Sequence, residues 1–343
     1  MTMCYFKGSD CVALFSLWAI FAWVLAVFVL MATTMLPAMA QDMRRFIDDT
    51  GRSVEIPIAP QRIAAMADNS VAVPLVELNS SIVASRGRFD ESGTPFFRSV
   101  VDLFPEFIAS QNLTFIGTQS ATDYEALIAV QPDLIIGRTW DESELDQLSA
   151  IAPVILLDDT GEAFDYYRKI ADASGRLAVF EQLAATYKET VEKQRILIGD
   201  HSFTFQNTQF TGTSTISVCG RFGALGQALD DLGFTITGLS AEVDARGISF
   251  CDDVSPEIIG YLEADFIFDT YRTDVFPNGP LGALERIDET VTGACRQLTA
   301  CSEGRMIFVP REYAFPVSFR SLTMMLHFVV SHVAGRPSAG PSR

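Results

Sequence analysis

Arginine and aromatic side chains gather at the ends of predicted strands in this chain of 343 residues. Guanidinium groups pair with carboxylate and phenolate oxygens through charge-assisted hydrogen bonds, and aromatic faces hold planar groups. Together they favour a bulky, planar, anionic ligand. The candidate ligand-binding residues are Asn69, Arg86, Arg88, Arg138, Trp140, Arg221, Phe222, Tyr271, Arg272, Arg311, Tyr313 and Phe315. For any one of these arginines, an ordinary surface ion pair with one of the 43 acidic residues is the alternative.

Motifs for catalysis and for binding of a bare metal ion are missing from the sequence. It contains no Gly-x-Ser-x-Gly elbow, no phosphate loop and no His-Glu-x-x-His pair. The three histidines, His201, His327 and His332, fall outside the predicted ligand loops, whereas a zinc site needs several ligands that converge. We therefore expect no enzyme activity, no intrinsic cofactor and no resident metal.

The charge balance limits the class of partner. The formal net charge is −18 at pH 7, which disfavours nucleic acid and anionic membrane surfaces. It favours a small-molecule ligand and a soluble protein, which we expect to be a monomer.

The first 40 residues have the pattern of a targeting segment. Lys7 precedes an apolar run from Val12 to Leu36, and Ala38-Met39-Ala40 has the small-x-small form of a signal-peptidase site. We predict that residues 1–40 are a signal peptide cleaved after Ala40, and that the mature protein is periplasmic. Because the run is long enough to span a bilayer, an uncleaved membrane anchor is the alternative.

Four cysteines, Cys219, Cys251, Cys295 and Cys301, follow the predicted leader. An even number in an oxidising compartment predicts disulfides. Cys295 and Cys301 bracket a short loop and are predicted to pair, which leaves Cys219 for Cys251. A metal site is the weaker alternative, since there is no Cys-x-x-Cys.

The elements that must position the candidate residues form two blocks. Continuous apolar strands alternate with helices, which predicts parallel sheets covered on both faces. In such sheets, ligands bind beyond the carboxyl ends of the strands, where the candidate residues fall. In the first block, residues 41–175, we expect a hairpin over 45–58, strands over 62–66, 81–85, 115–117, 133–137 and 154–157, and helices up to 78 and over 123–130 and 145–151.

A long amphipathic helix from Arg176 to Leu197 separates the blocks, and residues 176–199 are predicted to bridge them. In the second block, residues 200–334, we expect strands over 214–219, 235–237, 265–269 and 306–309 and helices over 223–232, 256–262, 281–287 and 318–333. The tail, residues 335–343, is rich in Pro, Gly and Ser and is predicted to be disordered.

One internal match links the two blocks. Glu125 and Glu257 each open a predicted helix, and Asp133 and Asp265 follow eight positions later, where an apolar strand begins. The match predicts two lobes of like topology. Chance similarity between two common helix–strand units is the alternative.

These motifs, in this order, resemble the solute-binding proteins of bacterial ABC importers that serve ferric siderophores, haem and vitamin B12. The resemblance covers residues 45–334. Its carriers are Asp49-x-Gly51, Val54-x-Ile56-Pro57, Pro60-x-Arg62-Ile63, Glu125, the run Gln131 to Ile136, the run Ile151 to Val154, and the bridging helix.

The resemblance implies an α/β fold of two Rossmann-like lobes with parallel sheets, joined by one long helix, with the ligand clamped between them. It also implies that Glu125 and Glu257 dock onto arginines of the permease dimer in the inner membrane. Their alternative role is favourable charge at a helix N-terminus.

The function we expect is capture of an anionic ferric siderophore and delivery to an inner-membrane ABC importer. Haem, with Tyr271 or Tyr313 as axial ligand, and cobalamin, held by aromatics such as Trp140, are alternatives within the same family. A membrane-anchored sensor domain or an enzyme on a similar fold is the alternative from a different class.

Overall fold

The computed structural model describes residues 41–110, 113–160, 162–212, 214–247, 250–274 and 278–336. The predicted leader, residues 1–40, and most of the predicted tail lie outside this part of the chain. Residues Met43–Arg343 form one compact unit, and the fold described below belongs to it. Within the described ranges, no helix combines the length and the apolar character that crossing a membrane would need.

The first lobe begins with the predicted hairpin, β1 (Met43–Ile47) paired antiparallel to β2 (Ser53–Pro57). A sheet in the order β7-β6-β4-β3-β8-β9 follows. Its parallel strands are β3 (Ile63–Ala65), β4 (Ile82–Phe89), β6 (Thr114–Thr118), β8 (Leu134–Arg138) and β9 (Val154–Leu157). Two short strands, β5 (Pro95–Phe96) and β7 (Ala121–Thr122), add antiparallel pairs to β4 and β6. The predicted parallel strands are therefore confirmed, although β4 extends beyond Ser85 to include Arg86 and Arg88.

Helices and turns connect these strands. Asp123 caps α5 by accepting a hydrogen bond from the Ala126 N–H at 2.9 Å. Three helices, α3, α4 and α7, were not predicted. One of them, α7, places Tyr166, Tyr167 and Ile170 in the core. The helical segments are η1 (Asp68–Ala72), α2 (Val73–Glu77), α3 (Arg98–Leu103), α4 (Pro105–Ser110), α5 (Tyr124–Ala129), η2 (Thr139–Glu144), α6 (Leu145–Ser149) and α7 (Ala163–Ala173).

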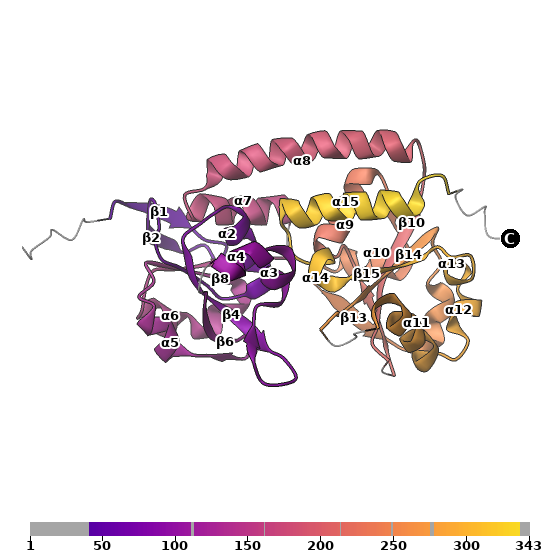
Figure 1. Ribbon diagram of the computed structural model, residues 1–343, viewed down its shortest axis with the longest axis horizontal. Coiled ribbons are helices and arrows are strands. Elements are labelled where there is room, and N and C mark those ends of the chain that lie inside the picture. The colour runs from indigo at the N-terminus through magenta and orange to yellow at the C-terminus, as the bar shows by residue number, and fades with distance from the viewer. Residues whose placement is uncertain are drawn as a thin grey trace, which may run out of the picture. The chain divides into compact units, whose positions relative to one another are not determined.

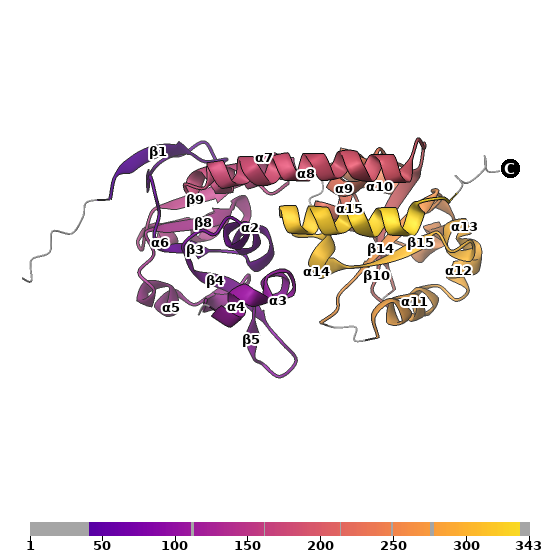
Figure 2. The ribbon, with the colours of Figure 1, turned by 45° about the horizontal axis from the view of Figure 1, so that its top comes forward.

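The predicted bridging helix is present as α8 (Leu177–Ile198), which ends at Gly199 with φ of 75°. It buries Phe180, Tyr187 and Val191. Both views of the ribbon show α8 lying alongside α15 (Phe319–Val333), the last helix of the chain (Figures 1 and 2).

The second lobe has a six-stranded sheet with the path β13-β11-β10-β14-β15. β10 (Thr204–Phe210), β14 (Phe266–Tyr271) and β15 (Met306–Pro310) are parallel, and β12 (Thr235–Ile236) pairs parallel to β10. The sheet differs from the expectation on one side, because β11 (Ile216–Cys219) and β13 (Cys251–Val254) run antiparallel to their neighbours. Both predicted disulfides are confirmed, and Cys219–Cys251 joins β11 to β13 directly across the pair.

Short helices complete this lobe. The segment predicted as a helix over 256–262 is a 3-10 helix. The helical segments are α9 (Gly223–Leu232), α10 (Gly238–Ala245), η3 (Pro256–Tyr261), α11 (Gly279–Thr290), α12 (Ala294–Gln297), α13 (Thr299–Ser302), α14 (Arg311–Ala314) and α15.

One apolar core joins the two lobes. Phe319, the first residue of α15, packs its ring 5.2 Å from that of Tyr167 in α7 and 5.3 Å from that of Phe180 in α8. The Tyr187 ring of α8 lies 5.9 Å from it. Because all four rings belong to one buried cluster, a change in the angle between the lobes would have to disturb close-packed side chains.

Candidate ligand-binding site

A cavity of about 350 Å³ lies at the carboxyl ends of β3, β4 and β6 in the first lobe. This is the edge at which a parallel sheet binds ligands. Asp68 follows β3, Arg86, Arg88 and Phe89 lie at the end of β4, and Thr118 ends β6. The structure therefore brings two of the predicted arginines, Arg86 and Arg88, to one cavity.

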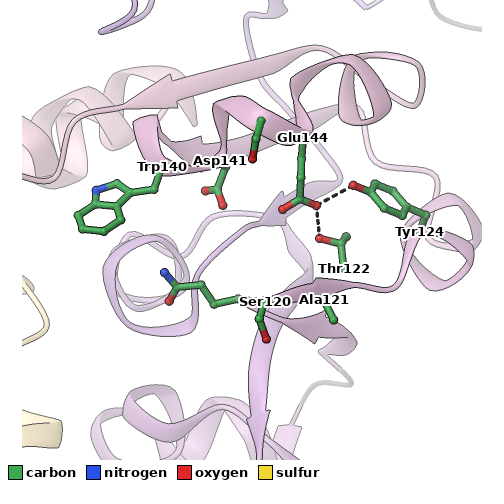
Figure 3. Close-up of a pocket in the computed structure, with 9 residues that line it drawn as sticks. Ser120, Ala121, Thr122, Tyr124, Trp140, Asp141 and Glu144 are labelled. Carbon is green, nitrogen blue, oxygen red and sulfur yellow. Dashed lines mark hydrogen bonds between the residues drawn. The ribbon is translucent and has the colours of Figure 1, made fainter.

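A second cavity of about 560 Å³ shares Gln119 and Ser120 with the first. Trp140, 58% exposed, stands at its wall. Figure 3 shows Glu144 pointing toward Thr122 and Tyr124, whose hydroxyls donate to its carboxylate at 2.5 and 2.6 Å. Burial alone would raise the pKa of the Glu144 carboxyl. These two hydrogen bonds and the charge of Arg86 outweigh burial and lower that pKa. The wall is thus polar and its carboxylate is ionised.

The guanidinium of Arg86 binds the acidic side chains of this wall. Its side chain is 1% exposed, and its guanidinium pairs with Asp141 at 2.6 Å and with Glu144 at 2.5 Å. A further hydrogen bond reaches the Thr122 hydroxyl. Because two carboxylates already neutralise Arg86, its main effect is to hold the two cavities in shape.

Arg138 is buried at the end of β8, with Asp159 at 3.6 Å and Asp141 at 3.9 Å. Burial is the largest effect on Asp159 and raises the pKa of its carboxyl, although the charge of Arg138 opposes it. Asn69, the remaining candidate in the first lobe, uses its side-chain oxygen to accept from the neighbouring Ser70 N–H at 2.9 Å.

Four arginines from the two lobes lie near one another, and one of them, Arg88, also lines the smaller cavity. Arg88 and Arg98 belong to the first lobe, and Arg272 and Arg311 follow β14 and β15 of the second. Burial and the charges of the other three lower the pKa of Arg311 to about 9. We call Arg88, Arg98, Arg272 and Arg311 the arginine cluster.

Carboxylates neutralise the arginine cluster only in part. Asp68 lies 3.4 Å from Arg88, Asp274 lies 2.6 Å from Arg272 and 3.8 Å from Arg98, and Glu312 lies 3.7 Å from Arg98. Nevertheless, the buried Nε atoms of Arg88, Arg98 and Arg311 have no hydrogen-bond partner among the described residues. Buried donors without partners are costly, and oxygen atoms of an anionic ligand would satisfy them.

Arg311 occupies a distinct environment within the arginine cluster. Its guanidinium carbon lies 4.3 Å from the centre of the Phe250 ring and 5.9 Å from that of Phe222. Its Nη1 donates to the Gln209 side-chain oxygen at 3.4 Å. In the part of the chain that the structure covers, Arg311 makes no ion pair with an acidic side chain.

The other candidates of the second lobe have different surroundings. Arg221 forms ion pairs with Asp230 at 2.5 Å and with Asp244. Its positive charge is therefore already neutralised within the protein. Phe222 is buried and packs against Phe315 at 5.1 Å. Tyr271 is 6% exposed and Tyr313 is half-buried, and burial followed by nearby acidic charges raises the pKa of both hydroxyls.

Four charged residues around the arginine cluster were not among the candidates: Arg98, Asp102, Asp274 and Glu312. Arg98 and Asp102 lie in α3, a helix that the sequence patterns did not predict. Glu312 directly follows Arg311 at the end of β15. This place after a strand was the one sequence feature that could have marked Glu312 as a candidate. Among the residues that the structure describes, no group of three His, Cys, Asp or Glu side chains is placed to hold a metal ion.

Glu125 and Glu257 are exposed, and each stands in the first turn of its helix, α5 or η3. Asp123 and Ser255 cap these helices with their side chains. The two glutamates are therefore accessible to a partner protein, and they occupy equivalent positions in the two lobes.

No protein-family model matches this chain. Two curated proteins resemble its sequence. "Probable siderophore-binding lipoprotein YfiY" of Bacillus subtilis is 26% identical over 232 residues, which is 65% of this chain and 68% of that protein. "Ferric-anguibactin-binding protein FatB" of Vibrio anguillarum is 21% identical over 300 residues, covering 79% of this chain and 82% of that protein. Both relatives are binding proteins by name.

The fold also matches that of solved binding proteins. The crystal structure of holo-ViuP aligns with a TM-score of 0.69 over 85% of this chain and 95% of ViuP, at 18% identity. The α/β fold of two lobes is therefore confirmed. The resemblance to siderophore-binding proteins, which the motifs predicted, is confirmed by the two curated relatives.

Proposed function

We propose that this chain is an exported solute-binding protein that captures a ferric siderophore between its lobes and delivers it to an ABC importer. The observation that carries the proposal is the arginine cluster, to which each lobe contributes two residues. The names of the two curated relatives support the same ligand class.

The charges of the site support an anionic chelate. Three buried guanidinium Nε donors have no hydrogen-bond partner among the described residues, and two of them have only long ion pairs, with Asp68 at 3.4 Å and Glu312 at 3.7 Å. A neutral ligand would leave these donors unsatisfied, whereas carboxylate or catecholate oxygens of a ferric chelate would bind them bidentately. Ligand oxygens would then replace the weak internal pairs at 3.4 to 3.8 Å.

Delivery would depend on the exposed glutamates of the two lobes. In this proposal Glu125 and Glu257 pair with basic residues of a permease dimer in the inner membrane, and the binding protein acts as a periplasmic monomer. Their equivalent positions at capped helix starts support the proposal.

The experiment is a fluorescence titration of the chain from residue 41, in which Trp140 is the only tryptophan. The ligand panel is ferric citrate, a ferric hydroxamate, a ferric catecholate, haemin and cobalamin. We expect saturable quenching by an anionic ferric chelate and a far weaker response to cobalamin. If no ferric chelate binds, by fluorescence or by calorimetry, the proposal is wrong.

Replacing Arg311 tests the role of the arginine cluster. Because Arg311 is buried and lacks an ion pair, Arg311→Ala should weaken the anionic chelate about 30-fold, or ~2 kcal/mol. The matched control is Arg168→Ala, since Arg168 is exposed and its ion pair among the described residues is with the exposed Glu181 at 3.0 Å. Equal affinities of the two variants would show that the ligand lies elsewhere.

A further inference from the structure

The three phenylalanines around Arg311 form one compact group. Ring centres of Phe222 and Phe250 lie 5.7 Å apart, those of Phe222 and Phe315 5.1 Å, and those of Phe250 and Phe315 5.3 Å. We call Phe222, Phe250 and Phe315 the aromatic box. Since Arg311 makes no ion pair among the described residues, the box and Gln209 are what fix its guanidinium.

The aromatic box is assembled from three separate segments of the chain. Phe222 lies between β11 and α9, Phe250 directly precedes β13, and Phe315 follows α14. The contact between the first and third segments is tight: a Cβ atom at Gly223, which has φ of +52°, would lie 2.0 Å from the Phe315 carbonyl oxygen. This contact therefore holds the first and third segments together and leaves the position of Phe250 to the segment that leads into β13.

The Cys219–Cys251 disulfide ties two of these segments together. Cys219 precedes Phe222 by three positions, and Cys251 directly follows Phe250. The two cysteines are partners in the β11–β13 ladder, with Cα atoms 4.0 Å apart and a sequence separation of 32. β13 is the edge strand and pairs only with β11 in the described sheet. The β11–β13 pairing ends at Cys219 and Cys251, so the disulfide fixes the end of the ladder that is next to Phe250.

We propose that the Cys219–Cys251 disulfide is a positioning element for ligand recognition. By fixing Phe222 and Phe250 relative to each other, it orients the Arg311 guanidinium toward an anionic ligand. The second disulfide, Cys295–Cys301, joins the short helices α12 and α13, and Cys301 packs against a different apolar cluster from the one that holds the aromatic box. The inference rests on the proposed function, because it names a determinant of affinity for the same ligand.

The test compares two disulfide-free variants, Cys219→Ala/Cys251→Ala and Cys295→Ala/Cys301→Ala. The probe is the ferric chelate that the unaltered chain binds most tightly in the titration above. We expect the first variant to lose about 10-fold in affinity, because Arg311 loses its fixed orientation, and the second to retain full affinity. Equal affinities would overturn the inference, whereas failure of the unaltered chain to bind any chelate would overturn the proposed function instead.

A double-mutant cycle separates positioning from general loosening of the lobe. Arg311→Ala should weaken binding about 30-fold in the unaltered chain but only about threefold in the Cys219→Ala/Cys251→Ala background. Arg272→Ala, outside the aromatic box, should have the same effect in both backgrounds. If Arg311→Ala has the same effect in both backgrounds, the disulfide does not act through Arg311.

A second variant covers the case in which the disulfide-free chain does not fold. Phe250→Leu removes the ring beneath Arg311 and leaves the disulfide intact, so it should also lower affinity about 10-fold and be coupled to Arg311→Ala. Phe328→Leu is the matched control, since Phe328 is another half-buried phenylalanine of this lobe, on α15. Unchanged affinity of Phe250→Leu in a folded protein would overturn the inference.

Discussion

Asp102 is a carboxyl near the arginine cluster whose pKa is strongly raised. Burial and the charge of Glu312 raise its pKa from 3.8 to about 6, although Arg98 opposes the shift. The folded protein therefore retains a proton that the unfolded chain releases between pH 3.8 and 6. The stability that this proton provides is complete below pH 3.8 and is lost as the pH rises through 6.

We expect Asp102→Asn, which mimics the protonated form, to stabilise the protein at neutral pH. The gain should be about 1 kcal/mol, because solvent screens a half-buried carboxyl, or roughly 2 °C in Tm. Thermal unfolding followed between pH 4 and 8 should show this gain at pH 7 and none at pH 4. Asp146→Asn, at an exposed position of α6, is the control, and a gain independent of pH would contradict the assignment.

Individual arginines show what a sequence pattern can and cannot predict about single residues. The rule that ligands bind at strand ends located Arg88, Arg272 and Arg311 correctly at the ends of β4, β14 and β15. It could not show that Arg86 and Arg221 are already neutralised by acids distant in sequence. Tertiary contacts decide which arginine is neutralised by an acidic residue of the same protein. A pattern of residue types does not contain these contacts.

At the scale of elements, Glu77 links the two lobes through a helix terminus. Glu77 ends α2, and its carboxylate accepts from the Phe319 and Arg320 N–H groups at 2.7 and 2.6 Å. These groups open α15, so a first-lobe side chain satisfies backbone donors at the positive end of a second-lobe helix. The Tyr167 hydroxyl donates to the same carboxylate at 2.6 Å.

We expect Glu77→Gln to destabilise the protein by about 2 kcal/mol, because hydrogen bonds to a charged acceptor are stronger than those to an amide oxygen. Urea unfolding measures the change. Glu106→Gln is the matched control: Glu106 also contacts Arg320, at 2.9 Å, but is 61% exposed and should cost less than 0.5 kcal/mol. Similar losses in the two variants would show that Glu77 acts as an ordinary surface acid.

β10 explains why the second lobe was harder to predict than the first. It lies between β11 and β14 in the sheet, yet it carries the buried polar residues Gln206, Asn207 and Thr208. Each has a partner: Gln206 donates to the Glu263 carbonyl, Asn207 to the Gly220 carbonyl and Thr208 to Asp269. A search for apolar strands misses such a segment, and with it the antiparallel direction of β11.

For the whole molecule, the long α8 helix was the most predictable feature, because its amphipathic period extends over 22 residues. What the sequence could not indicate is that α15 lies beside it and completes the connection through the Phe319 ring cluster. The lobes are thus joined by two helices and a shared core. Such a joint disfavours wide opening, so any signal of ligand binding to a permease must arise from small movements.

A joint of this kind also keeps Glu125 and Glu257 at a nearly constant separation, which is what simultaneous docking onto two permease subunits requires. We expect Glu125→Arg and Glu257→Arg each to reduce importer activity about 10-fold and the double variant to abolish it, because each reversal turns an attraction into a repulsion. Chelate affinity should not change. The measurement is uptake of the ferric chelate by cells that carry the importer and each variant.

The control for this prediction must alter the total charge equally. Glu189→Arg/Glu192→Arg, on the exposed face of α8, raises the formal net charge of −18 by the same amount as the docking variant. If long-range attraction between an acidic binding protein and the permease governed delivery, both double variants would lose uptake to the same extent, and added salt would reduce uptake by the unaltered chain as well. Full uptake by the α8 variant together with loss in Glu125→Arg/Glu257→Arg would instead assign delivery to two fixed contacts, one on each lobe.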